Sequence, residues 1–190
     1  MKKGSKLFVA FAIFGAASVV LTACSEPEVI IPAEELNVEE SLAILDEFSK
    51  SGWRACDLGV EHGEQLEDMG YDDTPYPFWN CRGVFYNEYP YEIRIVAEPN
   101  GTEIRYTELE YKRGHNESFY ALLRYYLRMQ GIQSESERFD LRSQLSGIIS
   151  SNPRTPDFRP VARLSDGRML ELAHNYPSSA FSTLRVRNPD

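Results

Sequence analysis

The sequence predicts an α+β fold: a single small domain with a mainly antiparallel sheet made of hairpins, about three helices packed with it and one disulfide. Three observations predict it. Apolar residues recur at helical spacing in three separate segments. Period-2 alternation, broken by Asn-Gly and Asp-Gly pairs, predicts hairpins. The order helix, strands, helices, strands lacks the regular strand–helix alternation of a parallel sheet.

The chain opens with a secretory signal. Residues 1–6 contain three lysines and no acid, and residues 7–21 contain no charge at all. A basic head followed by an apolar run is typical of a cleaved signal peptide. As a helix the run would span about 22 Å, short of the roughly 30 Å of a hydrocarbon core. We expect residues 1–23 to be removed.

The end of this run carries a resemblance. Leu21-Thr22-Ala23-Cys24 resembles the lipobox of bacterial lipoprotein precursors. The resemblance implies a diacylglyceryl group on the Cys24 sulfur, cleavage before Cys24, and acylation of the new amine by a fatty acid such as palmitate. In that family Ser25, where Asp would favour the inner membrane, points to the outer membrane. The alternative is that Cys24 merely follows an ordinary cleavable signal. The mature domain itself carries no family resemblance.

Composition limits the partners of the mature chain. Without residues 1–23 the chain keeps 167 residues, enough for one domain with a core, and 17 basic against 29 acidic residues, a formal charge of −12. At that negative charge we expect no nucleic-acid partner. The acids are concentrated in residues 26–73, which hold fifteen acids and two bases.

Two cysteines remain once Cys24 carries lipid. Cys56 and Cys81 form an even pair, which favours a disulfide in an oxidising envelope. The bridge would close about 26 residues and contribute roughly 3–4 kcal/mol. Its Cα atoms would normally lie about 4.4–6.8 Å apart. The alternative, a cysteine nucleophile paired with a histidine, lacks any surrounding protease signature; the candidate histidines are His62, His115 and His174.

The first part of the mature chain is expected to be a tether, a helix and an irregular stretch. Residues 24–33 contain two prolines and form the tether, and residues 34–190 form the domain. Asn37 and Glu40 make a capping-box pair that begins a helix ending near Gly52. Residues 61–69 are compatible with a short helix. Residues 74–77 contain two prolines and are expected to be irregular.

The middle of the chain predicts strands and then two helices. Strands are expected over 81–86, 91–95 and 102–112, the last two joined by a turn at 98–101. A long helix is expected over 117–130, ending at Gly131. Ser134 and Glu137 form a capping box that begins the next helix.

The last part predicts a connector and three strands. Residues 150–160 contain three prolines and are expected to link the second helix of this pair to a hairpin. Strands over 161–164 and 169–173 flank an Asp-Gly turn, and 182–187 form the final strand.

No catalytic, metal or cofactor motif is present in the sequence. The segment around Glu61 and His62 lacks the spacing of a metal site, and no serine-nucleophile or phosphate-loop motif occurs. We therefore predict no catalytic residue, no metal ligand and no cofactor.

The candidate binding surface combines acids with aromatics. Eight aromatic residues fall within residues 71–91, next to the acidic stretch. Tyr and Trp are favoured at interfaces, and an acidic surface attracts a basic partner. The predicted surface comprises Glu61, Glu64, Asp72, Asp73, Tyr76 and Trp79. The alternative is that the aromatics pack the core and the acids are simply solvated.

These observations predict an envelope lipoprotein held to the bilayer through acylated Cys24 and facing the periplasm. We expect it to act as a protein-binding or accessory module, for which an inhibitor or immunity-type protein is one concrete form. The alternative class is an envelope hydrolase acting on cell-wall or lipid material.

Overall fold

The structure is a computed structural model of the chain. It describes residues 30–49, 53–62, 65–66, 70–71, 74–85, 89–112, 116–151, 154–175 and 181–188. The lipobox, Cys24 and residues 24–29 of the predicted tether lie outside these ranges. Among the described residues, no helix is both long and apolar enough to cross a membrane.

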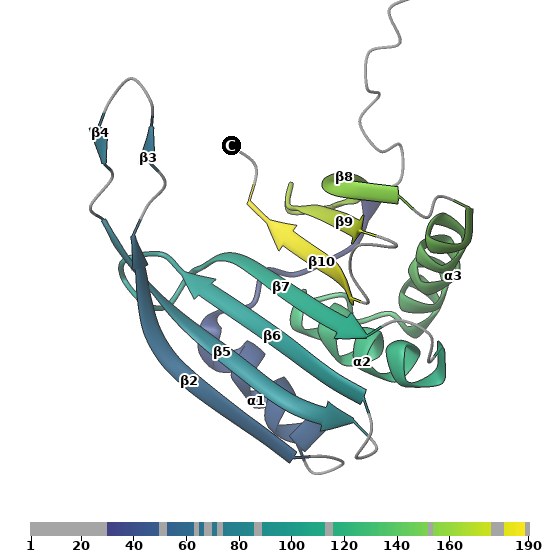
Figure 1. The fold of residues 1–190 in the computed structure, drawn as a ribbon, viewed down its shortest axis with the longest axis horizontal. Helices are drawn as coiled ribbons and strands as arrows, with labels where there is room; N and C mark the ends of the chain where they lie inside the picture. Colours follow the sequence, from purple (N-terminus) through teal and green to yellow (C-terminus); the bar gives the residue numbers. More distant parts are fainter. Residues whose placement is uncertain are drawn as a thin grey trace, which may run out of the picture.

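The domain is an eight-stranded sheet that curls around three helices (Figure 1). The predicted α+β class with its mainly antiparallel sheet is confirmed. The helices are α1 (Val38–Ser49), α2 (Asn116–Met129) and α3 (Glu135–Ser151). The strands of the sheet are β1 (Ile30–Ile31), β2 (Trp53–His62), β5 (Pro75–Phe85), β6 (Tyr89–Ala97), β7 (Ile104–Lys112), β8 (Arg154–Leu164), β9 (Met169–Asn175) and β10 (Phe181–Arg187).

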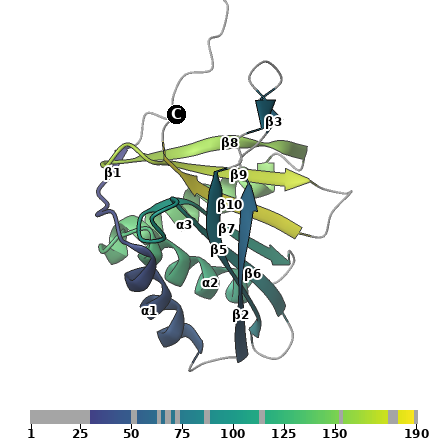
Figure 2. The same cartoon turned by 90° about the vertical axis from the view of Figure 1, so that its left-hand side faces the viewer.

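Two antiparallel meanders make up this sheet, whose order is β1-β8-β9-β10-β7-β6-β5-β2. The first meander is β2-β5-β6-β7 and the second is β8-β9-β10; β10 pairs with β7 and joins them. β1 alone is parallel to its neighbour, β8. The short hairpin of β3 (Gln65–Leu66) and β4 (Gly70–Tyr71) forms a separate two-stranded sheet. Because the sheet twists strongly, β8 and β9 run crosswise to β2 and β5 in Figure 2.

The core lies between the helices and the concave face of the sheet. The helices contribute fully buried leucines such as Leu45, Leu127 and Leu145, and the sheet contributes Ile95 and Leu184. Inside this core Tyr126 places its hydroxyl 3.0 Å from the Thr107 side-chain oxygen. That contact satisfies a polar group that would otherwise be costly to bury.

The predicted starts of the first and third helices are confirmed. The Glu40 amide donates to the Asn37 side chain and the Asn37 amide donates to the Glu40 carboxylate, each at 2.9 Å. This reciprocal pair satisfies amides at the start of α1. The Glu137 amide donates to the Ser134 hydroxyl at 3.4 Å at the start of α3.

The Cys56–Cys81 disulfide is present, with sulfurs 2.05 Å apart. The two cysteines are direct partners on the neighbouring strands β2 and β5. Their Cα atoms lie 3.9 Å apart, closer than the about 4.4–6.8 Å expected from the sequence and closer than the about 4.5 Å usual for facing residues of an antiparallel pair.

Regular structure extends further than the sequence predicts in the segment after α1. The short helix expected over residues 61–69 is wrong, because Glu61 and His62 continue β2 and residues 65–66 form β3. Residues 74–77 were expected to be irregular, yet Pro75 and Pro77 belong to β5. There β5 pairs with β2 only, since its pairing with β6 begins at Phe78, so the missing proline N–H groups can face the open side.

The same lengthening occurs at both ends of the second meander. The connector expected over residues 150–160 is mostly strand, because β8 begins at Arg154. The prolines of β8 coincide with register shifts against β9, which accommodate them. Ile30 and Ile31, placed in the predicted tether, pair with β8 as β1, so the described fold begins at residue 30.

Candidate functional site

Strand β2 is a long edge of the sheet. It pairs with β5 over ten consecutive residues without a register shift, and no other described strand borders it. A strand in this position presents a row of unpaired backbone N–H and C=O groups on its outer side. Those groups can receive an extended segment of another protein.

One face of β2 carries exposed aliphatic side chains. The side chain of Leu58 is 70% exposed and that of Val60 is 56% exposed, although large aliphatic residues are usually buried. Leu58 lies opposite Trp79 and Val60 lies opposite Pro77 on β5. Trp79 is half-buried and packs against the core. The result is an apolar strip beside an open strand edge.

The other long open edge, on β8, is protected. β1 covers only Arg163 and Leu164, which leaves the rest of β8 without a neighbour on that side among the described strands. That stretch contains Pro156 and Pro160 and two register shifts. Prolines and bulges are devices that prevent edge pairing. β2 contains no proline, so it is the edge that remains open to pairing.

The opposite face of β2 is occupied by internal contacts. Glu61 forms an ion pair with Arg94 on β6 and accepts a hydrogen bond of 3.0 Å from the Tyr106 hydroxyl on β7. The Phe78 ring lies where a side chain at Gly59 would project, and the Arg94 guanidinium stacks on that ring. Burial and the Glu61 charge raise the pKa of Tyr106, so its hydroxyl stays protonated.

This ion-pair network continues across the convex face of the sheet. Arg185 on β10 contacts Glu171 at 3.0 Å and Glu108 at 3.9 Å, and Arg187 also contacts Glu171. Burial raises the pKa of Glu108, although Arg185 and Arg94 lower it in part. Each of these carboxylates has a guanidinium partner, and the arrangement holds neighbouring strands together.

The predicted surface residues do not share one face. Glu61 and Tyr76 are paired on the convex face, whereas Trp79 faces the helices beside Leu58. Tyr76 is only 8% exposed and lies under the Arg105 guanidinium. Glu64, Asp72 and Asp73 lie outside the described residues, so the acidic part of the predicted surface stays a prediction.

The sequence interpretation missed β2, although a signal was present. Cys56, Leu58 and Val60 alternate with Asp57, Gly59 and Glu61, which is the period of a strand. The pattern does not reveal that the side chains of Leu58 and Val60 are exposed. An alternating apolar row ordinarily marks a buried face.

The described residues bring no three His, Cys, Asp or Glu side chains together in a metal-binding group. Comparisons with known protein families, curated proteins and solved structures find no match to this chain.

Proposed function

We propose that this protein is a lipid-anchored envelope lipoprotein that binds a partner protein along strand β2. The observation that carries the binding role is the open ten-residue edge with the exposed Leu58 and Val60 beside it. The anchor rests on the lipobox-like Leu21-Thr22-Ala23-Cys24 behind a basic, apolar leader. The disulfide, which suits an oxidising compartment, supports an envelope location.

The partner that suits this edge presents an extended, basic segment. Strand addition supplies affinity through main-chain hydrogen bonds and specificity through alternate side chains. Those side chains would lie on Leu58 and Val60. The acid-rich stretch of residues 26–73, which contains β2, favours lysine or arginine in the partner. An inhibitor or immunity-type protein that blocks an envelope enzyme would act in this manner.

Site-specific crosslinking in the native envelope tests the proposal. A photo-crosslinking residue would replace Leu58 or Val60, with Ile30 as the matched control. Ile30 is 64% exposed and lies on β1, at the opposite end of the sheet. We expect one and the same protein product from positions 58 and 60, and not from position 30. A product shared by all three positions, or none from 58 and 60, would contradict a binding role for β2.

A charge introduced into the strip gives a second measurement on the captured partner. Leu58→Asp places a carboxylate in the apolar strip and should weaken binding about tenfold or more, the order expected for an interface anchor. Ile30→Asp, its matched control, should leave affinity unchanged. Association should also slow as salt increases if the partner is basic.

A further inference from the structure

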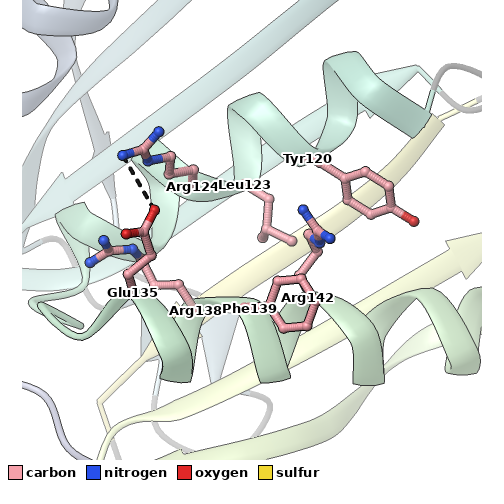
Figure 3. A pocket seen from close by; sticks show the side chains of 7 residues that line it. All are labelled: Tyr120, Leu123, Arg124, Glu135, Arg138, Phe139 and Arg142. Atoms are coloured by element: carbon pink, nitrogen blue, oxygen red, sulfur yellow. Dashed lines mark ion pairs between the residues drawn. The ribbon is translucent and has the colours of Figure 1, made fainter.

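A pocket of about 170 Å³ lies between α2 and α3 and has no lining residue from β2. Figure 3 shows the side chains that line it. Its lining, which we call the arginine pocket, comprises Tyr120, Leu123 and Arg124 of α2 and Glu135, Arg138, Phe139 and Arg142 of α3. Figure 3 shows Arg124, Glu135 and Arg138 at one end and Arg142 and Tyr120 at the other. The volume is small for a whole organic ligand and suits a single charged group.

Most arginine side chains elsewhere in the described structure have a close carboxylate partner. Among the same described residues, the arginines of the arginine pocket do not. Arg82, Arg94, Arg128, Arg168, Arg185 and Arg187 each contact a Glu or Asp at 3.3 Å or less. In the arginine pocket, Arg124 has only a contact of 3.6 Å with the exposed Glu135. Arg142 has no carboxylate within ion-pair distance among the described residues.

Two of the three guanidinium groups of the pocket, those of Arg138 and Arg142, are held in place by other contacts. Arg142 stacks on the rings of Tyr120 and Phe139, at 4.5 and 4.6 Å from their centroids. Arg138 donates through Nη1 to the backbone carbonyls of Ile132 and Gln133, both at 2.6 Å. Stacking and backbone hydrogen bonds fix the planes of these two guanidinium groups, so they lose little entropy when they bind an anion.

The arginine pocket is positively charged, although the protein as a whole is negatively charged. It gathers three guanidinium groups against one carboxylate, in a protein of formal charge −9. Burial lowers the pKa of Arg138, and the neighbouring positive charge of Arg124 lowers it further. A bound anion would relieve this repulsion.

Helix α3 lies near the start of the described chain, and therefore near the proposed membrane anchor. The opposite flank of α3 lines a second pocket together with Ile30, Ile31 and Pro32, where the described chain begins. Only six peptide steps separate Ile30 from Cys24, which at full extension span at most about 22 Å. If Cys24 carries lipid, as proposed above, α3 is held near the phosphate layer of the bilayer.

We propose that the arginine pocket binds the phosphate group of an anionic phospholipid headgroup in the membrane that anchors the protein. Guanidinium groups bind phosphate oxygens in pairs of parallel hydrogen bonds, and basic pockets at a membrane surface take lipid headgroups. Phe139, a large apolar side chain that is 54% exposed beside the pocket, would contact the apolar part of the lipid. The inference depends on the proposed lipid anchor for its choice of ligand.

Native mass spectrometry of the full-length protein in detergent tests it. The probes are dihexanoyl phosphatidylglycerol, dihexanoyl phosphatidylcholine and inorganic phosphate at equal concentration. The variants are Arg142→Gln and Arg124→Gln, with Arg82→Gln as the control. Arg82 lies on β5, its side chain is 58% exposed, and the control removes the same charge.

We expect phosphatidylglycerol to be retained in preference to both other probes. Each pocket variant should lower its retention about tenfold, the worth of a charge-assisted hydrogen bond, and Arg82→Gln should not. Equal retention by wild type and pocket variants would overturn the site. Binding of inorganic phosphate without preference for the lipid would overturn the headgroup as its ligand. The mass of the Cys24 peptide, measured in the same preparation, shows separately whether the anchor exists.

Discussion

Glu108 shows at the scale of one residue how the convex face of the sheet holds charge. Its carboxylate lies half-buried on β7, opposite Arg94 on β6 and Arg185 on β10. Burial raises its pKa more than the two arginines lower it. The native state therefore holds a proton on Glu108 at pH values where the unfolded chain has released it.

Replacing this carboxyl should change the pH dependence of stability. A native pKa above the ordinary 4.5 means that the native state binds more protons, so Glu108 costs stability as pH rises through the raised pKa. Well below pH 4.5 the group is protonated in both states and this cost disappears. We expect wild type to lose stability relative to Glu108→Gln as pH rises above 4.5.

Urea unfolding of both proteins over a pH series measures the difference. Stability curves that run parallel over the whole series would show that Glu108 titrates alike in the native and unfolded states.

At the scale of an element, two glycines, one just after α2 and one in α3, lie in opposite environments: one is tightly packed and the other has open space beside it. Gly131 follows α2 with φ of 74°, and the Ile132 amide donates to the Leu127 carbonyl around it. A Cβ at Gly131 would lie 1.7 Å from the carbonyl oxygen of Glu34. Gly147 lies within α3, exposed, with nothing within 4 Å of the position of a Cβ. The first glycine follows the end of a helix and the second lies inside one.

The alanine variants of these two glycines should therefore differ in sign. Gly131→Ala should destabilise by more than the about 1–2 kcal/mol of a left-handed alanine, because the backbone of Glu34 must also move. Gly147→Ala should stabilise by about 0.5–1 kcal/mol, since alanine loses less backbone entropy in a helix. Urea unfolding of the two variants beside wild type measures both effects, and equal shifts of the same sign would contradict this account.

The whole molecule has two functional ends in our proposal. α3, β1 and β8 lie where the described chain begins, and β2 lies at the opposite end of the sheet (Figure 1). A protein held to the membrane beside α3 would present β2 away from the bilayer. This arrangement allows anchoring and partner binding at the same time.

Lipidation at Cys24 is the prediction on which this orientation depends. Cys24→Ala removes the thiol that would accept the diacylglyceryl group, so precursor should remain uncleaved and radiolabelled fatty acid should not be incorporated. Cys56→Ala, a matched control at another cysteine, should still be labelled. Labelling of Cys24→Ala, or a mature chain that starts elsewhere, would refute the anchor.

The sequence by itself determined the features that depend on neighbouring residues. The caps at Asn37 and Ser134 and the turns at Asn100-Gly101 and Asp166-Gly167 follow from side chains a few positions apart and from glycines with positive φ. The disulfide followed from the cysteine count and from the predicted oxidising compartment. The α+β class followed from the order of these local signals.

Only the tertiary structure decided which strand lies at the edge of the sheet and which of the described arginines have no close carboxylate partner. Leu58 alternates like a buried strand residue, yet it is 70% exposed on a strand that lies at the edge of the sheet. The sequence does not distinguish the environments of Arg94 and Arg142. In the structure Arg94 forms an ion pair with Glu61 of another strand, whereas Arg142 stacks on two aromatic rings. Such pairings join residues far apart in the chain, so their energies depend on the complete packing and not on any local pattern.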